Sequence, residues 1–352
     1  MHILVINPGA TSTKLAVFQE KQEEWRSTLL HSQEDLAPFH HVNEQIGYRL
    51  ELILQEVEKA GYRMADFAAV VGRGGLLRHI PSGTYKVNQR AVDDMNDPPM
   101  GEHAANLGVL ICDELTRRYG MPSYFVDPVS VDELEPVARI SGHAAFERQS
   151  FFHALNQKSV ARRAAEKLRK PYEDCNFIVV HMGGGVSVAA HRKGKVVDVY
   201  NVKDEGAFSM DRGGSLPVTR VIDYCFSGKS YQEVKRELGT QAGMVSYLGT
   251  KDLREVETRM DAGDEKAALL FDALSYQLCK DIGAMFVVLD GRANAIVLTG
   301  GIAHSTRFTA LIKKRVDTLA PVLTYAGENE MQALAEGGLR ALRDPKQLLT
   351  YL

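Results

Sequence analysis

The feature that most constrains the fold is a pattern that occurs twice, in which a buried strand leads into a glycine-containing loop and a second strand. It occurs first where the apolar runs Ile3–Ile6 and Leu15–Phe18 flank NPGATSTK. It returns where Phe177–Val180 leads into HMGGG, followed by apolar runs over Val186–Ala190 and Val196–Val199. Such runs joined by glycine turns are typical of β-hairpins. The residues match poorly but the order of elements repeats, which predicts two similar halves with a cleft between them.

Length and charge agree with two domains that act on small molecules. A chain of 352 residues is longer than one hydrophobic core usually supports. Lys and Arg total 42 against 45 Asp and Glu, a formal net charge of −3, so no basic excess supports binding to nucleic acid or anionic membrane. The N-terminal apolar stretch is too short for a signal peptide, and no apolar run approaches the roughly 20 residues that span a bilayer. We therefore expect a cytoplasmic protein with no nucleic-acid or membrane partner.

Cysteine spacing gives no sign of a metal cluster. The chain has four cysteines and no CxxC motif, so a zinc or iron–sulfur site is not expected. In a reducing compartment these side chains are expected to be buried free thiols: Cys112, Cys175, Cys225 and Cys279.

Apolar periodicity and breaker residues predict the elements around the two hairpins. Helices are expected over residues 44–60, 104–119, 151–168, 267–289 and 331–342, and further strands over 68–71, 124–126 and 295–298. The acidic, proline-punctuated segment DPVSVDELEP suggests a crossing between domains. We expect one domain of residues 1–140 with 335–352 and another of residues 141–334.

The first loop carries groups that can hold an anion. Asn7, Ser12 and Lys14 lie in NPGATSTK, where backbone N–H groups can converge on a phosphate and the lysine adds a full positive charge. The loop is not a Walker A motif, because GxxxxGK[ST] is absent and a strand follows it instead of a helix. A simple polar hairpin tip explains this loop equally well.

The second and third glycine turns also follow buried strands. The second, HMGGGVS, contains His181, Gly183, Gly184 and Gly185; it is not a dinucleotide fingerprint, because a strand follows it where that motif opens a helix. Consecutive glycines often mark a close approach of the backbone, to a ligand or within a tight turn, and the adjacent histidine favours a ligand. The third, TGGIAHS with Gly300 and Gly301, could let a base or ribose lie against bare backbone, but it is a weak signal alone.

Phosphoryl transfer needs groups that neutralise the phosphoryl oxygens, together with a metal ion. Besides His181, the candidate donors are Arg73 in GRGG, Arg212 in DRGG and His153 in SFFHALN. A lone arginine is usually a solvated surface group, but both of these stand directly before paired glycines. His103 and Asn106, one helical turn apart, either face the cleft or cap their helix, and we favour the cleft.

Three carboxylates are candidates to support a metal ion: Asp127, Glu328 and Glu330. Mg²⁺ needs only one or two carboxylates when water and phosphate oxygens complete its shell. For Glu328 and Glu330, a simple contribution of negative charge to a helix N-terminus is a strong alternative.

Taken together, these residues resemble the acetate and butyrate kinase family, within the larger group of actin, Hsp70 and sugar kinases. HMGGGVSVAAHRKG fits the family signature H-x-G-x-G-x-S-hydrophobic-x-A-x-x-x-G at every position. INPGATSTK fits a second signature except at Ala10, where the family usually has serine. SFFHALNQKSVARRAAEKL resembles the segment with the transition-state histidine, which maps to His153. GRGGLLRHIPSGTYKVN, GEHAANLG and LTGGIAHS are closer to the butyrate kinase branch.

The resemblance implies an α/β protein of two similar actin-like (ribonuclease H-like) domains with an interdomain nucleotide cleft. It implies direct, reversible, Mg²⁺-dependent transfer of phosphate from ATP to a short or branched carboxylate, giving acyl phosphate and ADP, in a homodimer or larger homo-oligomer. Asn7, Ser12 and Lys14 would handle the transferring phosphate, and the His181–Gly185 loop would hold the nucleotide phosphates.

The remaining roles carried over from the family concern charge, metal and substrate. Arg212 and His153 would stabilise the planar phosphoryl group, and Arg73 would bind the carboxylate. Asp127 and either Glu328 or Glu330 would organise Mg²⁺, and Gly300 and Gly301 would leave space for adenosine. A sugar kinase of the same fold and an ATPase switch of the actin or Hsp70 type are the alternatives.

Overall fold

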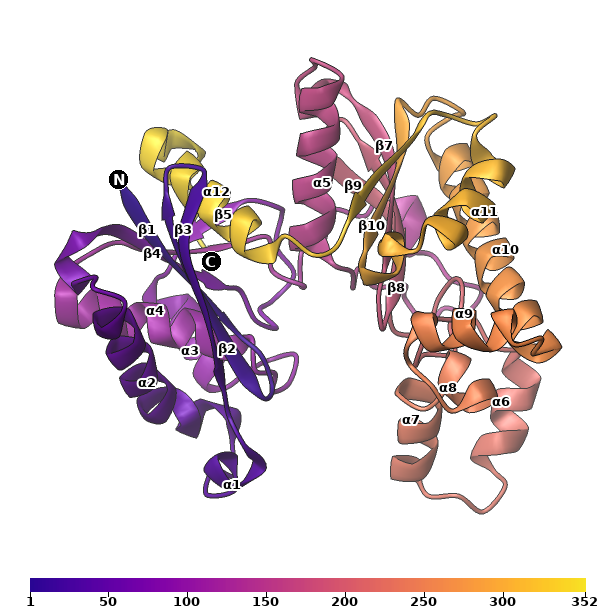
Figure 1. Ribbon diagram of the computed structural model, residues 1–352, viewed down its shortest axis with the longest axis horizontal. Coiled ribbons are helices and arrows are strands. Elements are labelled where there is room, and N and C mark those ends of the chain that lie inside the picture. Colours follow the sequence, from indigo (N-terminus) through magenta and orange to yellow (C-terminus); the bar gives the residue numbers. More distant parts are fainter. The chain divides into compact units, whose positions relative to one another are not determined.

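The computed structural model describes all 352 residues, and the chain divides into two compact units. The first unit comprises Met1–Asp132 with Asn329–Leu352, and the second comprises Glu133–Glu328. Each unit is built on one β-sheet with helices packed against it (Figure 1). The domain bounds expected from the sequence remain a prediction.

The first unit contains a six-stranded mixed sheet in the order β3-β2-β1-β4-β6-β5. Its strands are β1 (His2–Pro8), β2 (Ser12–Gln19), β3 (Gln22–Leu30), β4 (Phe67–Arg73), β5 (Thr84–Lys86) and β6 (Ser123–Val126). Strand β1 pairs antiparallel with β2 and parallel with β4, and β4 pairs parallel with β6. The carboxyl ends of β1, β4 and β6 therefore lie at one edge of the sheet.

Helices cover both faces of this sheet (Figure 1). They are α2 (Ile46–Lys59), α3 (Gln89–Asn96), α4 (Asn106–Tyr119) and α12 (Glu330–Arg343), while the short helix α1 (Gln33–Leu36) follows β3 and has no buried residue. Helix α4 lies so close to β4 that a Cβ atom on Gly72 would stand 2.4 Å from the carbonyl oxygen of Gly108. On the opposite face, a Cβ atom on Gly338 of α12 would stand 2.4 Å from Val71 Cγ2. Glycines at these contacts allow both helices to approach the sheet closely.

The second unit contains a five-stranded sheet in the order β11-β10-β7-β8-β9. Its strands are β7 (Asn176–Met182), β8 (Val186–Arg192), β9 (Lys195–Tyr200), β10 (Ala295–Gly300) and β11 (Val322–Ala326). Strands β7, β10 and β11 are parallel, while β8 and β9 continue from β7 as an antiparallel meander. The order 9-8-7-10-11 repeats the order 3-2-1-4-6 of the first unit, so the two units share one sheet topology.

Alternating side chains of β7 enter two separate hydrophobic clusters, as the period of two along a strand requires. Phe177 and Val179 pack with Ala161 of α5 (Ala154–Lys167), whereas Ile178 and Val180 pack with residues of α10 (Glu265–Val288). The other helices of the unit are α6 (Val218–Cys225), α7 (Tyr231–Gly239), α8 (Gly243–Leu248), α9 (Leu253–Asp261) and α11 (Thr306–Val316).

The predicted α/β class, the two glycine hairpins and the repeated half are confirmed. Each helix and strand expected from periodicity is present, with ends shifted by a few residues. The pattern did not predict β3, β5, β11 or the helices α1, α3, α6 to α9 and α11. None of the helices is both long and apolar enough to cross a membrane.

The expectation that all four cysteines are buried is wrong for two of them. Cys112 and Cys175 are buried, whereas Cys279 is half-buried and Cys225 is exposed at the end of α6. Helix α6 has no buried residue, so its apolar positions did not indicate burial within this chain.

Candidate active site

The candidate residues form two groups, one in each unit, and in both units they stand where parallel strands end. In the first unit Asn7 is near the end of β1, Arg73 ends β4 and Asp127 follows β6. Because these strands are adjacent and parallel, their ends place all three side chains at one edge of the sheet. This edge is the usual location of ligand sites in α/β sheets.

Asn7, Arg73 and Glu330 make direct contact in the first unit. The Asn7 side-chain amide donates a hydrogen bond to Glu330 Oε2 at 2.8 Å, and Arg73 Nη1 lies 3.1 Å from Glu330 Oε1. Glu330 is the first residue of α12, which brings a carboxylate from the end of the chain to two strands formed near its beginning. Arg73 thus pairs with a carboxylate, as a carboxylate-binding group should be able to do.

Asp127 is held in an unusual backbone conformation. Its φ angle is +38°, in the left-handed region that residues other than glycine seldom adopt. Its Oδ1 accepts hydrogen bonds from the Ser82 hydroxyl at 2.6 Å and the Gly83 amide at 2.8 Å, and its own N–H donates to the Gly83 carbonyl. A strained residue fixed by three hydrogen bonds points to a functional demand on the position of this carboxylate.

The rest of the first group lies around the β1–β2 loop and α4. Lys14 pairs directly with Asn7 across the hairpin, which places both side chains on the same face, and Lys14 is exposed.

His103 just precedes α4, and burial, with the charge of Arg73, lowers its pKa. Asn106 is buried and its Oδ1 accepts from the backbone N–H of Leu76, so it fixes the loop after β4. Its Nδ2 donates to the Gly101 carbonyl, so both polar ends of this side chain bond to neighbouring backbone, which favours the alternative that Asn106 packs its helix.

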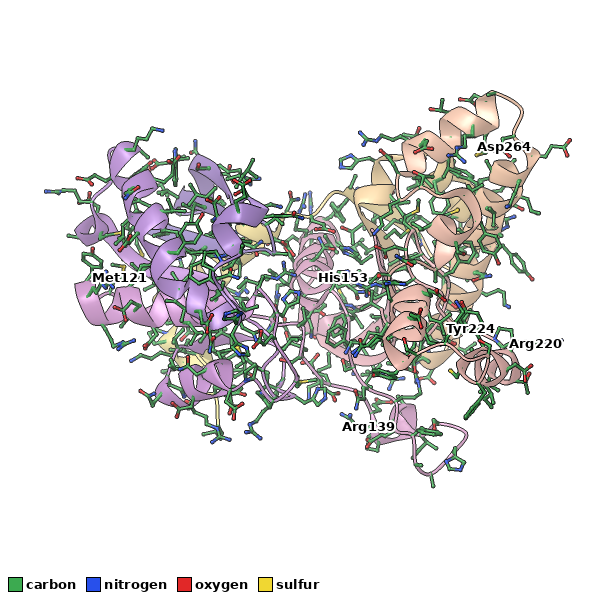
Figure 2. The ribbon with its side chains drawn as sticks, turned by 90° about the horizontal axis from the view of Figure 1, so that it is seen from below. Met121, Arg139, His153, Arg220, Tyr224 and Asp264 are labelled. Atoms are coloured by element: carbon green, nitrogen blue, oxygen red, sulfur yellow. The ribbon has the colours of Figure 1, made fainter.

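In the second unit, the two imidazoles of His153 and His181 stack on one another. Their ring centroids are 3.6 Å apart and the planes differ by 10°. The helix predicted over residues 151–168 includes His153, but the structure begins α5 one residue later and leaves His153 just before it, at the position marked in Figure 2. His181 Nδ1 bonds to Asn156 Oδ1 at 2.8 Å, while its Nε2 lies 3.1 Å from Glu328 Oε1 without hydrogen-bond geometry. The buried Nε2 atom is therefore available to a ligand at this edge.

A hydrogen-bond chain fixes the orientation of His153. Gln157 Nε2 donates to Ser187 Oγ at 2.8 Å, and Ser187 Oγ lies 3.0 Å from His153 Nδ1. The serine oxygen accepts from Gln157, so its own proton is available to His153 Nδ1; with that bond His153 carries its N–H on Nε2. Burial lowers the pKa of His191, whose Nε2 donates to Gln157 Oε1, so this chain begins at a neutral imidazole.

Arg212 lies against the HMGGG loop. A Cβ atom on Gly185 would stand 3.2 Å from the Arg212 guanidinium carbon and 2.4 Å from Val202 Cγ2, so this position requires glycine. The guanidinium donates to the Val202 carbonyl at 3.0 Å, and its side chain is one-third exposed. Ser209 links the two segments, because its hydroxyl donates to the Gly184 carbonyl and accepts from the Arg212 N–H.

A cavity of about 630 Å³ opens beside the same loop. Its walls include residues of the second and third glycine turns, of the loop that precedes Arg212 and of α9: Gly183, Gly184, Met210, Gly301, Ile302 and Leu253. The volume is in the range of small-molecule sites. Gly301 has open space where a side chain would stand, whereas Gly300 does not line the cavity. The φ angle of Gly300 is +89°, and a Cβ atom there would collide with the backbone of Met182. The fold itself therefore requires glycine at this position.

The two candidate carboxylates near the C-terminus belong to different groups of site residues. Glu328 lies beside His181 in the second unit, and Glu330 lies with Asn7 and Arg73 in the first. Only Glu330 shares a sheet edge with Asp127. The sequence could not distinguish these neighbours, because the boundary between the units falls between them.

The duplicated sheets and glycine hairpins define a protein of the actin-like ATPase fold. Solved structures with this fold include acetate kinase from Porphyromonas gingivalis, with a TM-score of 0.80 and 18% identity over 97% of this chain and 99% of that one. A propionate kinase from Francisella tularensis matches with a TM-score of 0.74 and 19% identity over 96% and 98%. A putative N-acetylmannosamine kinase from Listeria monocytogenes matches with a TM-score of 0.55 and 15% identity over 97% and 99%.

Sequence similarity identifies the family. The model of the acetokinase family matches residues 143–341. A curated relative, Butyrate kinase 1 of Clostridium acetobutylicum, is 46% identical over 351 residues, covering 99% of both chains. The chain belongs to the acetokinase family.

Proposed function

We propose that the protein catalyses reversible phosphoryl transfer between ATP and a short-chain carboxylate, butyrate or a branched analogue, giving acyl phosphate and ADP. The observation that carries this proposal is the 46% identity to Butyrate kinase 1 over nearly the whole of both chains. The fold and the positions of Asn7 and Arg73 support it, because both side chains already bind a carboxylate, that of Glu330, at a sheet edge.

The reaction needs no general base in this proposal. A carboxylate is ionised at neutral pH, so its oxygen attacks the γ-phosphorus directly and the bond from that phosphorus to the ADP oxygen breaks. Arg73 binds the acceptor carboxylate, and Asn7, Ser12 and Lys14 hold the transferring phosphoryl group. Because the acceptor enters as an anion, the cationic groups must first offset its repulsion from the phosphates.

We assign to the second unit the groups that stabilise the charge developing on the phosphoryl oxygens. Arg212 and the Nε2–H of His153 donate to these oxygens, and the His181–Gly185 loop binds the nucleotide phosphates. Donors fixed in advance, as the His181 stack and Ser187 fix His153, lower the barrier without reorganising during the reaction. The nucleoside occupies the cavity lined by Gly301 and Ile302.

The donor chemistry of the first unit suits Mg²⁺. Asp127 and Glu330 supply carboxylate oxygens, and no group of three or more His, Cys, Asp or Glu side chains forms a metal cage. Mg²⁺ commonly takes one or two carboxylates and completes its octahedral shell with water and phosphate oxygens. When bound, the ion would neutralise part of the phosphate charge. We also propose that the protein acts in the cytoplasm as a homodimer or larger homo-oligomer.

Hydroxylamine trapping tests the proposed activity. With ATP and Mg²⁺, rates of hydroxamate formation are measured for acetate, propionate, butyrate, isobutyrate and valerate. We expect hydroxamate with a maximum at butyrate or a branched acid. Release of ADP without a carboxylate and without hydroxamate would instead indicate an ATPase switch, and phosphorylation of a sugar would indicate a sugar kinase.

A further inference from the structure

The largest fully buried side chain in the protein is an arginine that lies behind the first glycine loop. Arg49 is on α2 and has 0% exposed surface. It stands on the apolar face of that helix, next to the buried Leu50 and one turn before Ile53. A charged group is seldom fully buried unless it is paired, so its partners decide what it does there.

The partners of Arg49 are carbonyl, hydroxyl and amide oxygens, and none is a carboxylate. Nη1 donates to the Gly9 carbonyl at 2.9 Å, the Ser12 carbonyl at 3.2 Å and Thr13 Oγ1 at 3.0 Å. Nη2 donates to the Ala10 carbonyl at 3.1 Å. Nη2 and Nε both donate to the side chain of Gln45. The guanidinium is thus fully hydrogen-bonded while its positive charge is not neutralised.

These bonds determine which way the loop presents its peptide groups. In a trans peptide the C=O and the following N–H point in opposite directions. The carbonyls of Gly9 and Ala10 point at Arg49, so the N–H groups of Ala10 and Thr11 point away from it. Both residues are exposed, and neither N–H donates to another group of the protein. Two adjacent outward N–H groups, with an unneutralised cation behind them, form a site suited to an anion.

We propose that Arg49 is a positioning residue for the phosphoryl group, which shapes residues 9–13 so that the Ala10 and Thr11 amides bind phosphate oxygens. This inference rests on the proposed kinase function but concerns a residue that touches no substrate. It also gives a role to Ala10, whose side chain lacks the usual hydroxyl: the backbone of this residue supplies both the anchored carbonyl and the donor.

A second contact extends the same arrangement to His31. Thr13 Oγ1 accepts from Arg49, so its own proton goes to His31 Nε2 at 2.9 Å. That imidazole is buried, and burial, with the charge of Arg49, lowers its pKa to about 4. His31 is therefore a neutral acceptor at physiological pH. Its bond from Thr13 ties the loop to the end of β3, while the bonds from Arg49 tie it to α2.

The principal experiment compares kinetics of Arg49→Met and Arg49→Lys in the ADP-forming and ATP-forming directions. We expect Arg49→Met to lower kcat/KM for butyryl phosphate at least tenfold while KM for ADP is unchanged, since the ADP cavity lies in the second unit. Arg49→Lys, which keeps the charge but not the fork of donors, should be intermediate. A folded Arg49→Met protein with the wild-type kcat/KM for butyryl phosphate would overturn the inference.

A matched control separates loop shaping from general stability. Arg148 is also largely buried but pairs with Asp198 and Glu205 in the second unit. Arg148→Met should lower the melting temperature without a selective loss of kcat/KM for butyryl phosphate. An equal selective loss in both variants would show that the effect of Arg49 is only structural.

A measurement on the wild-type protein needs neither variant nor activity. Inorganic phosphate is titrated into ¹⁵N-labelled protein, and the amide resonances of Ala10 and Thr11 are followed by NMR. We expect both to shift with a common saturation curve. If neither moves at saturating phosphate the inference fails, even where hydroxamate assays support the kinase; if the kinase assay fails, these shifts still decide whether the loop binds phosphate.

Discussion

The imidazole of His153 lies flat against that of His181, with 3.6 Å between ring centroids. His181 is buried and fixed through Nδ1 to Asn156, so it forms a rigid surface on which His153 is oriented. The stack and the bond from Ser187 therefore fix the plane of the His153 ring and the directions of its two ring nitrogens.

Replacement of His153 should separate packing from chemistry. His153→Phe keeps a ring in the stack but has no N–H, and we expect turnover to fall about 100-fold or more, the usual effect of losing a transition-state donor. Its melting temperature should stay closer to wild type than that of His153→Ala. The hydroxamate assay and thermal unfolding measure the two effects. Near-normal turnover of His153→Phe would remove His153 from the proposed mechanism.

Arg212→Ala tests the assignment of charge stabilisation. Loss of a donor to the phosphoryl oxygens should lower kcat by about 10²–10³-fold, roughly 3–4 kcal/mol, while the fold is retained. Arg220→Ala is the matched control, because Arg220 is exposed on α6 and lies away from His153 (Figure 2). Equal rates for the Arg212→Ala variant and the control would contradict the role given to Arg212.

The paired glycines Gly300 and Gly301 should respond differently to substitution. A Cβ atom on Gly300 would stand 2.3 Å from the Met182 carbonyl oxygen in a left-handed backbone, so Gly300→Ala should reduce stability. Gly301 faces open space at the cavity wall, so Gly301→Val should fold normally and raise KM for ATP several-fold. Steady-state kinetics and urea unfolding distinguish the two. An unchanged KM for ATP in Gly301→Val would place the nucleotide elsewhere.

Glu330 and Glu328 should differ in their effect on Mg²⁺. Because Glu330 shares a sheet edge with Asp127, Glu330→Gln should raise the Mg²⁺ concentration needed for half-maximal rate, and Glu328→Gln should change it less. Binding of Mn²⁺, followed by electron paramagnetic resonance, makes the same comparison without turnover. A larger effect at Glu328 would reverse this assignment.

Asp281 should make the protein less stable as the pH rises from about 4 to about 6. Burial raises the pKa of this carboxyl to about 6, although the Ala207 N–H and Lys280 favour its ionised form. The folded state therefore holds a proton that the unfolded chain has lost, and raising the pH through this window costs stability. A shift of about two units corresponds to roughly 3 kcal/mol.

Asp281→Asn keeps an acceptor for Ala207 but buries no charge. Its free energy of unfolding should exceed that of wild type at pH 8, and the gain should shrink at pH 5. Urea unfolding at both values measures this, with Asp272→Asn, a more exposed position on the same helix, as the control. A gain that is equal at the two pH values would show that ionisation of Asp281 is not the cause.

The fold class and the candidate residues could be predicted from the sequence because the relevant signals are local. A buried strand that runs into glycine, as at Val180 or Leu298, places the next side chains at a sheet edge. The resemblance to a known family then assigned roles to those positions. Neither signal depends on contacts between distant parts of the chain.

What the sequence did not reveal depends on such contacts. Arg49 falls among apolar residues at helical spacing, and its carbonyl partners are invisible in side-chain patterns. The structural need for Gly300 arises from the backbone of a neighbouring strand, and the exposed apolar face of α6 resembles a buried one in sequence. Glu330 and Glu328 are two residues apart but belong to different units.

The return of α12 to the first unit has a consequence for synthesis of the chain on the ribosome. Asn7 meets Glu330, a residue made 323 positions later, and α12 packs on β1, β4 and β6. Domains generally fold as units during translation, and those made first usually fold first. Here the second unit is complete before the first has its last helix, so one face of the first sheet stays uncovered until α12 has been made. A nascent chain arrested before Asn329 should therefore expose apolar surface on the sheet of Met1–Asp132, and a chaperone would bind there.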